Sequence, residues 1–408
     1  MSSFSIPLTG LEASSTALNT IANNLSNMNS TAFKSQDVIF SDLFYQQIGD
    51  TGAGDPLQVG AGTQVASTET SFTQGSIDET GNATDVALNG QGFFVVENGG
   101  AAEYTRDGDF TLSADGALTT QDGQNVMGYP VVNGAVDTNA PLTAIQIPVG
   151  QVEQPAATST MSLTANLDAS AAAGTEVPAQ ITIYDSLGVA HVATINFTSQ
   201  GNGAWNYAIS LPAGDATGGT NLTGTLQFDA NGNLTSPAQN VPGIGFTGLS
   251  DGANDLTINW NLYGSNNTPT ITQVASASAV SATNQNGYAS GEYSGFTIDS
   301  SGVVSAEFSN GQTTPVGQLA LASITNQQGL TITAGNNYQT TLASGAASVG
   351  VAGAAGLGTI QDEALEESNV DISTQFSNLI VQQQAFDASS KAITTFDTIS
   401  QDTLNMIH

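Results

Sequence analysis

Chemistry in this chain would have to come from carboxylates, because other reactive side chains are scarce. The 408 residues include 35 Asp and Glu but only 3 Lys and Arg, 2 His and no Cys. His408 is the last residue and His191 lies in an alternating, strand-like segment, so neither is placed as a catalytic base. Carboxylates are numerous enough for a glycosidase pair, but no spacing singles out two of them. The sequence therefore predicts a protein that is not an enzyme and that uses no cofactor.

A bound calcium ion is the second kind of chemistry to consider. Four aspartates, Asp107, Asp109, Asp115 and Asp122, lie within sixteen positions. The segment has neither the twelve-residue loop of an EF-hand nor a repeated nine-residue calcium motif. Three of the four precede glycine, and Asp-Gly is a common hairpin-turn dipeptide. Turns therefore explain these residues best and no metal site is predicted, while a calcium-binding secreted enzyme stays open as an alternative.

The chain is strongly acidic, with a formal charge of −32. Its basic residues, Lys34, Arg106 and Lys391, are scattered, so they cannot form the positive surface that nucleic acid or anionic lipid requires. No stretch approaches the roughly 18 apolar residues of a transmembrane helix. Residues 1–10 lack the basic and apolar regions of a cleaved signal peptide. We therefore expect no nucleic-acid partner, no membrane insertion and no cleaved secretory signal.

Heptad spacing predicts a helix over residues 9–29. Leu11, Leu18 and Leu25 are seven residues apart, and Ser14, Ile21 and Met28 occupy the interleaved positions. A stripe of this kind buries its apolar face against a partner, because a short helix alone is marginal in water.

The C-terminal segment repeats the same spacing and predicts a second helix. The seven-residue series is Ile372, Leu379, Phe386 and Ile393, with Phe376 and Leu404 in the interleaved register. Ser368 or Asn369 is expected to cap this helix, with Asp371 in its first turn. We expect the two stripes to pair as a coiled coil, with each other or with those of neighbouring copies.

Short strand-like segments and turn dipeptides fill the chain between the helices, from about residue 70 to 350. Residues 191–197 alternate between polar and apolar types, as a half-buried antiparallel strand does. Composition shifts near 150–160 and 275–285 mark the edges of an inserted domain. The expected fold is mainly β, with antiparallel β-domains between paired terminal helices. The expected domains are a helical core (1–33 with 365–408), a connector (34–70 with 345–364), an inner β-domain (71–149 with 285–344) and an outer β-insert (150–284).

Four motifs occur in order along the chain. The first, 11–34, contains Asn23, Asn24, Asn27, Phe33 and Lys34, and the second, 80–94, contains Asn89, Gly90, Gly92, Phe93 and Phe94. The third, 104–129, contains Arg106 and Gly108, and the fourth, 365–391, contains Ser368, Asn369, Val370 and Asp371. Together they resemble the motifs of the bacterial flagellar rod and hook axial protein family. Ala32, Gln375 and Ser390 stand where that family commonly has glycine, an acidic residue and asparagine.

The resemblance is closer to hook proteins than to distal rod proteins, because segments 163–168 and 184–188 of the insert resemble hook outer-domain motifs. It implies a structural subunit that self-assembles into the flexible curved tube linking the basal-body rod to the filament. The residues of the stripes and of the first and fourth motifs would serve self-assembly, and those of the second and third motifs would form turns. A distal rod protein, or an adhesin or surface-layer protein, is the alternative.

The same resemblance implies the partners and the location. The partners would be further copies of this chain, the distal rod protein, the hook cap protein, the hook–filament junction protein and the flagellar type III export apparatus. The location would be the extracellular hook of the flagellum, reached without a cleaved signal peptide.

Overall fold

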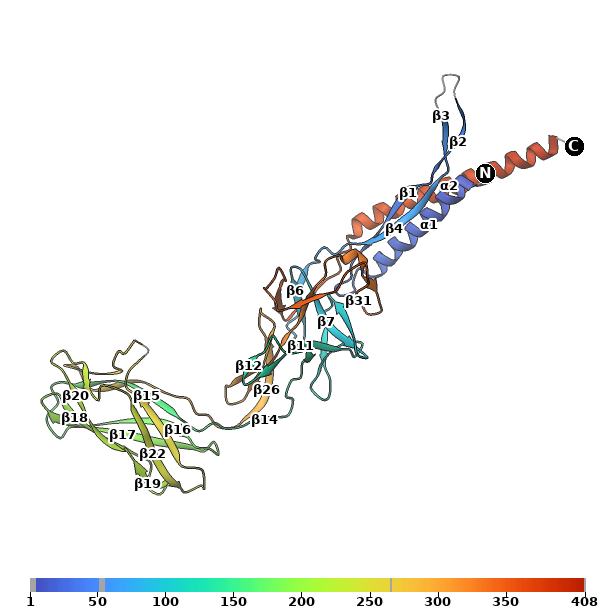
Figure 1. Ribbon diagram of the computed structural model, residues 1–408. Helices are drawn as coiled ribbons and strands as arrows, with labels where there is room; N and C mark the ends of the chain where they lie inside the picture. The colour runs from blue at the N-terminus through green and yellow to red at the C-terminus, as the bar shows by residue number, and fades with distance from the viewer. Residues whose placement is uncertain (1–4, 51–55, 265, 407–408) are drawn as a thin grey trace. The chain divides into compact units, whose positions relative to one another are not determined.

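The computed structural model describes residues 5–50, 56–264 and 266–406. Residues 1–4 and 407–408 of the expected helical core, and 51–55 of the expected connector, therefore lie outside the described residues. The chain divides into two compact units (Figure 1). We call Met1–Val149, Phe296–Ala306 and Thr314–His408 the terminal unit, and Gly150–Gly295 with Glu307–Thr313 the insert unit. The expected outer insert, 150–284, falls within the insert unit, which extends further to Gly295 and also includes 307–313.

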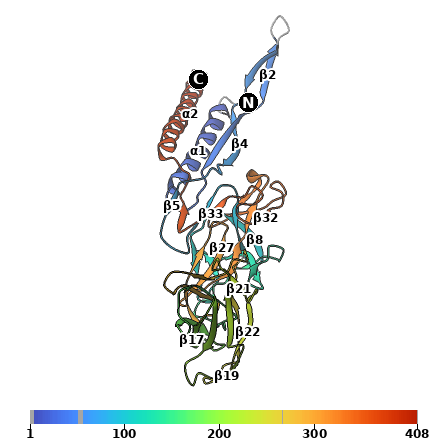
Figure 2. The ribbon, with the colours of Figure 1, turned by 90° about the vertical axis from the view of Figure 1, so that its left-hand side faces the viewer.

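One helix forms towards each end of the chain, and the two lie side by side in the terminal unit (Figures 1 and 2). α1 spans Ser5–Ser26 and α2 spans Ile372–Met406. They run antiparallel, because Gly10 faces Ser389 while Asn24 hydrogen-bonds to Gln375. The expected fold class, mainly antiparallel β with contacting terminal helices, is confirmed. Neither described helix is long and apolar enough to cross a membrane.

The ends of the helices differ from the expected ones. α1 begins at Ser5 rather than at residue 9, because a proline in the first turn, Pro7, does not interrupt helical hydrogen bonds. The cap of α2 is Asp371, whose Oδ1 accepts the N–H of Thr374 at 2.9 Å, and not Ser368 or Asn369. Asn369 is unavailable as a cap because its amide is bonded to the backbone of Ser35 and Ser71.

The face that α1 buries coincides only in part with the expected stripe, which contributes Ser14 and Ile21 to it. Its buried residues are Ala13, Ser14, Ala17, Ile21 and Asn24. The three leucines of the stripe, Leu11, Leu18 and Leu25, are only half-buried, and Met28 is 39% exposed. Small side chains let the two helix backbones approach closely; a Cβ atom at Gly10 would lie 3.0 Å from Ser389 Oγ.

A β-ribbon covers another side of α1. β1 (Gln36–Asp42) pairs antiparallel with β4 (Thr63–Thr70), and β2 (Tyr45–Asp50) pairs with β3 (Pro56–Gly60). Thr9 Oγ1 on α1 accepts the N–H of Thr63 at 3.3 Å. This ribbon falls in the expected connector, outside the 70–350 range in which strands were predicted.

The rest of the terminal unit is a β-domain around Phe93, Tyr104, Tyr129 and Tyr338. Its principal sheet runs in the order β28–β11–β7–β8–β31–β30. The strands before the insert are β5 (Ile77–Glu79), β6 (Val86–Asn89), β7 (Phe93–Asn98), β8 (Ala101–Thr105), β9 (Phe110–Leu112), β10 (Leu118–Thr120), β11 (Asn125–Val132), β12 (Ala135–Val136) and β13 (Thr143–Ala144). Those after it are β29 (Leu321–Ser323), β30 (Thr331–Ile332), β31 (Asn337–Gln339), β32 (Ser348–Gly350), β33 (Thr359–Asp362) and β34 (Ala364–Glu366), with a 3₁₀ turn at Gln327–Gly329. The chain passes between the units within β26 (Gly291–Ile298), β27 (Val303–Phe308) and β28 (Thr313–Leu319).

The insert unit contains two sheets that share one apolar core, centred on the fully buried Trp205 and Trp260. One sheet runs β16–β17–β18–β20–β21, and the other runs β19–β22–β23–β15–β24 with β25 added to β15. The expected alternation in 191–197 is confirmed, because every second residue from His191 to Phe197 is buried. The strands are β14 (Val152–Glu153), β15 (Thr160–Asp168), β16 (Glu176–Tyr184), β17 (Ala190–Gly201), β18 (Ala204–Ser210), β19 (Ala216–Thr220), β20 (Thr223–Phe228), β21 (Leu234–Ser236), β22 (Val241–Leu249), β23 (Leu256–Asn261), β24 (Ile271–Val274) and β25 (Ala279–Gln285).

Candidate functional site

Two of the chain's three basic residues meet one carboxylate in the interior of the terminal unit. Lys34 Nζ lies 2.5 Å from Glu366 Oε1, and Arg106 Nη1 lies 3.4 Å from Glu366 Oε2. All three side chains are at most 3% exposed. We call these three residues the junction, because they come from the first, third and fourth sequence motifs. The junction therefore ties together segments that are more than 300 residues apart.

Backbone groups supply further hydrogen bonds to the junction, although the buried Arg106 Nε has no partner among the described residues. Lys34 Nζ also donates to Thr73 O at 2.9 Å, and Arg106 Nη2 donates to Gly90 O at 2.7 Å. Glu366 Oε1 accepts the N–H of Gly75 at 2.9 Å. Charges removed from water must be paired in this way, since an unpaired buried charge costs several kcal/mol.

Burial has the largest effect on the pKa of each of the two cations. It lowers the pKa of Lys34 and of Arg106, and the carboxylate of Glu366 opposes that shift in both. The carboxylate of Glu366 therefore favours the charged form of both side chains. The sequence motifs singled out Lys34 and Arg106 but not Glu366. Because the chain has only three Lys and Arg, the occurrence of these two within motifs indicated that each has an acidic partner.

Two asparagines of the first and fourth motifs clamp the chain beside the junction. Asn24 donates to Gln36 O at 2.8 Å and accepts from Gln36 N at 3.0 Å, so α1 is fixed to β1. Asn369 accepts from Ser35 N at 2.7 Å and donates to Ser71 O at 2.8 Å. The side-chain amides thus replace β-ladder hydrogen bonds where the two ends of the chain meet.

Residues of the second and third motifs pack against the junction. Phe93 and Phe94 are fully buried, and the ring of Phe93 lies 5.6 Å from the Arg106 guanidinium carbon. Gly90 has a φ of +112°, a conformation that L-residues rarely adopt. Gly108 is required for a different reason than the expected hairpin turn: a Cβ atom there would lie 1.7 Å from Val86 O.

Several expected site residues are not gathered into the junction. Asn23 and Asn89 are exposed, Gly92 lies beside Leu357, and Asn27 Nδ2 donates back to Asn23 O at 2.9 Å. Ser368 Oγ accepts from the half-buried Val370, and Phe33 O accepts from Asn369 N. Along α2, Leu379, Phe386 and Ile393 are half-buried, whereas Ile372 and Phe376 are 46% and 52% exposed.

Of the four aspartates that raised the calcium alternative, Asp115 and Asp122 lie in turns, and Asp109 pairs with Asp85 in an isolated β-bridge. Asp107 Oδ1 accepts the N–H of Asp109 at 3.0 Å, and Asp115 Oδ1 accepts from Ser113 Oγ at 2.6 Å. Among the described residues, no three of them bring their carboxylates close enough to share one ion. Burial, reinforced by Asp109, Asp122 and Asp85, raises the pKa of Asp107 to about 6.

Comparison with known families places four matches in order along the chain. Residues 7–34 match "Flagella basal body rod protein", and residues 87–202 match "Flagellar hook protein FlgE/F/G D1 domain". Residues 156–288 match "Flagellar basal body protein FlaE D2 domain", and residues 361–406 match "Flagellar basal body rod FlgEFG protein C-terminal".

Full-length relatives and a solved structure agree with these matches. The flagellar hook protein FlgE of Escherichia coli (strain K12) is 32% identical and covers 99% of both chains. The hook protein FlgE of Treponema pallidum (strain Nichols) is 32% identical and covers 98% of both. The crystal structure of Helicobacter pylori flagellar hook protein FlgE2 has a TM-score of 0.55 at 15% identity, covering 71% of this chain and 100% of that one. This last likeness concerns the fold.

Proposed function

This chain belongs to the flagellar hook protein family, and we propose that copies of it stack helically into the curved hook that links the basal-body rod to the filament. The chain is the structural subunit of that tube and transmits the torque of the motor. Similarity to hook proteins over the whole chain is the observation that carries this function. The insert favours a hook over a distal rod, because distal rod proteins resemble the two flanks joined with little between them.

An exposed apolar patch on α2 supports assembly with further copies. Ile372, Phe376, Ile380 and Val381, which we call the α2 patch, are 46–59% exposed. Gln375 is the only buried residue among those described in this 35-residue helix. A long helix packed so sparsely in one chain is marginal by itself. A second copy covering the α2 patch would supply the missing burial.

The half-buried stripes extend this contact. We propose that Leu11, Leu18 and Leu25 on α1, and Leu379, Phe386 and Ile393 on α2, complete their burial between copies. The small residues of α1 hold the two helices of one chain together, which leaves the larger side chains at the margins of the pair. Within one subunit the helices would thus be paired but incompletely buried, and assembly would finish the core.

The remaining partners follow from the place of a hook in the flagellum. The distal rod protein would contact one end of the tube, and the hook cap and hook–filament junction proteins the other. The flagellar type III export apparatus would carry the chain out unfolded, and a chain without cysteine suits passage between redox compartments.

Assembly of the purified full chain tests the proposed contact. Phe376→Ser with Ile380→Ser removes two half-exposed apolar side chains from the α2 patch. Further burial of each side chain between copies would contribute about 1 kcal/mol to the free energy of assembly. Loss of both contributions should therefore raise the critical concentration for tube formation about 30-fold. The measurement is sedimentation of tubes over a concentration series.

Leu342→Ser is the matched control, because Leu342 is fully exposed on the β-domain of the same unit. This variant should assemble like the wild type. An unchanged critical concentration in the double variant, with the helical content of the monomer intact, would contradict the proposed contact between copies.

A further inference from the structure

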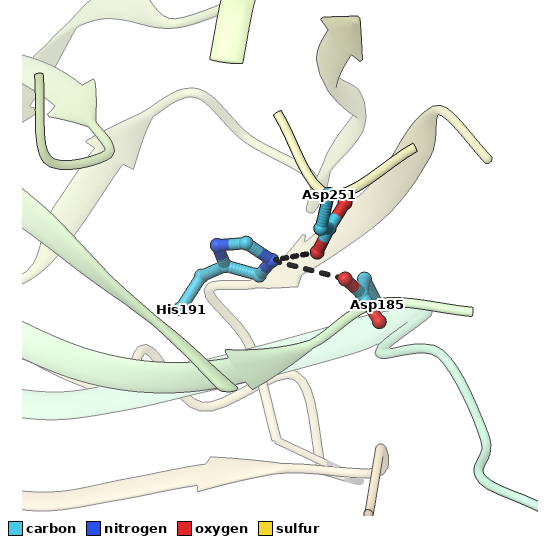
Figure 3. A group of neighbouring side chains, drawn as sticks. All are labelled: Asp185, His191 and Asp251. Carbon is cyan, nitrogen blue, oxygen red and sulfur yellow. Dashed lines mark hydrogen bonds and ion pairs between the residues drawn. The ribbon is translucent and has the colours of Figure 1, made fainter. Parts of the chain in front are cut away.

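The insert unit holds a buried histidine surrounded by three carboxylates. His191 is 4% exposed, and its Nε2 lies 3.1 Å from Asp185 Oδ2 and 3.5 Å from Asp251 Oδ2 (Figure 3). On the other side of the ring, Nδ1 lies 3.2 Å from Asp215 Oδ2. Neither the junction nor the assembly of helices uses this group.

Backbone turns hold two of the carboxylates in place. Asp185 follows β16, and its Oδ1 accepts the N–H groups of Leu187 and Val189 at 2.8 and 2.9 Å. Asp251 follows β22, and its Oδ1 accepts the N–H of Ala253 at 3.0 Å. In both residues one oxygen is fixed by a turn, and the other points at the same imidazole nitrogen (Figure 3).

The charge of this group is not balanced by protein cations. Residues 150–295 contain no lysine or arginine. A protonated imidazole would offset only one of three negative charges. Asp185 is wholly buried, whereas the side chains of Asp215 and Asp251 are 32% and 22% exposed. A buried carboxylate such as that of Asp185 is stable when it is paired or coordinates a metal ion, and a divalent cation would offset the two negative charges that the imidazole leaves.

We propose that Asp185, His191 and Asp251 bind one divalent transition-metal ion, for which Zn²⁺ is the best match. Ligand atoms about 2.0–2.1 Å from a tetrahedral Zn²⁺ lie about 3.3 Å from one another. The two separations from His191 Nε2, 3.1 and 3.5 Å, bracket that value. All three ligand atoms lie within 4.8 Å of one another.

The surroundings of His191 fit metal binding in two further ways. A metal-binding histidine commonly donates its second N–H to a carboxylate, and Asp215 is placed to accept it. The imidazole favours transition metals over Ca²⁺ and Mg²⁺, which prefer oxygen ligands. The ion would also join the two sheets of the insert unit, because His191 lies in β17 and Asp185 follows β16 of one sheet, whereas Asp251 follows β22 of the other.

Titration of the untagged, metal-free full chain with ZnCl₂ tests the site. Calorimetry should give one Zn²⁺ per chain, and the thermal unfolding midpoint of the insert unit should rise with Zn²⁺ but not with Mg²⁺ or Ca²⁺. Asp251→Asn keeps the turn oxygen but removes the carboxylate charge, so it should weaken Zn²⁺ binding at least tenfold. His191→Gln should abolish stoichiometric binding.

Asp255→Asn is the matched control, because Asp255 lies on the same connection and its Oδ1 accepts a turn N–H, that of Gly248. It should bind Zn²⁺ like the wild type, as should His408→Gln, which removes the other histidine. Absence of stoichiometric Zn²⁺ binding in the wild type would overturn the proposal. Equal affinity in the wild type and in a folded Asp251→Asn variant would also overturn it.

Discussion

Replacement of Glu366 by glutamine should destabilise the terminal unit strongly. The substitution keeps the size of the side chain but removes the charge that Lys34 and Arg106 share. Both carboxylate oxygens face cations, so either orientation of the new amide turns its NH₂ group towards one of them. The change therefore replaces an attraction with a contact between two donors.

The magnitude follows from the burial of the three side chains. Removing one partner of a buried ion pair costs about 3–5 kcal/mol, because the other charge is left without compensation. Lys34 and Arg106 keep their bonds to Thr73 O and Gly90 O, which soften the loss without neutralising the charges. A loss of this size is a large part of the roughly 5–15 kcal/mol that stabilises a typical domain.

The two units report separately on unfolding, which makes the assay specific. Both tryptophans, Trp205 and Trp260, lie in the insert unit, whereas both helices lie in the terminal unit. In a denaturant titration of Glu366→Gln, the helical circular dichroism signal should be lost at lower denaturant concentration. The tryptophan fluorescence transition should not move.

Glu367→Gln makes the same chemical change at the neighbouring, exposed position and is the control. It should leave both transitions within about 0.5 kcal/mol of the wild type. If Glu366→Gln behaves like Glu367→Gln, the junction does not hold the terminal unit together and the reasoning is refuted.

Three further predictions concern pH, packing and salt. The pKa of Asp107 is about 6 in the folded chain against an ordinary 3.8, so its proton is held more tightly when folded and stability should fall as the pH rises from about 4 to 6. Asp107→Asn should flatten this fall and stabilise the terminal unit by about 2 kcal/mol at pH 7, as measured by denaturation at several pH values. Gly108→Ala should cost more than about 3 kcal/mol in the same assay, while Gly295→Ala, which has nothing within 4 Å of its new Cβ, should cost little. Tube formation should be promoted by salt between about 10 and 500 mM, since the charge of −32 makes subunits repel, and salt-independent light scattering would contradict this.

Heptad spacing predicted both helices because helical periodicity is a local property of the sequence. Its stripe included the buried Ser14 and Ile21 but missed Ala13, Ala17 and Asn24, since two of these are small and the third is polar. The cap of α2 was misassigned for a similar reason. Asn369 has the right side chain for a cap, but its amide is used to bridge distant segments of the chain.

The segments of the site could be predicted, but their pairing could not. The motifs indicated that Lys34 and Arg106 matter, whereas their meeting at Glu366 depends on contacts across more than 250 residues. His191 was placed correctly in an alternating, half-buried strand. Its neighbours Asp215 and Asp251 come from connections on other strands, and nothing in the local pattern brings them together.

Electron microscopy of flagellar basal bodies from a strain that lacks this gene tests the role of hook subunit most directly. We predict complete rods that end at the outer surface and carry no curved extension, with the hook restored by the wild-type gene. Rods cut short inside the envelope would instead make the chain a rod component. Intact hooks with filaments in that strain would contradict its role as the hook subunit.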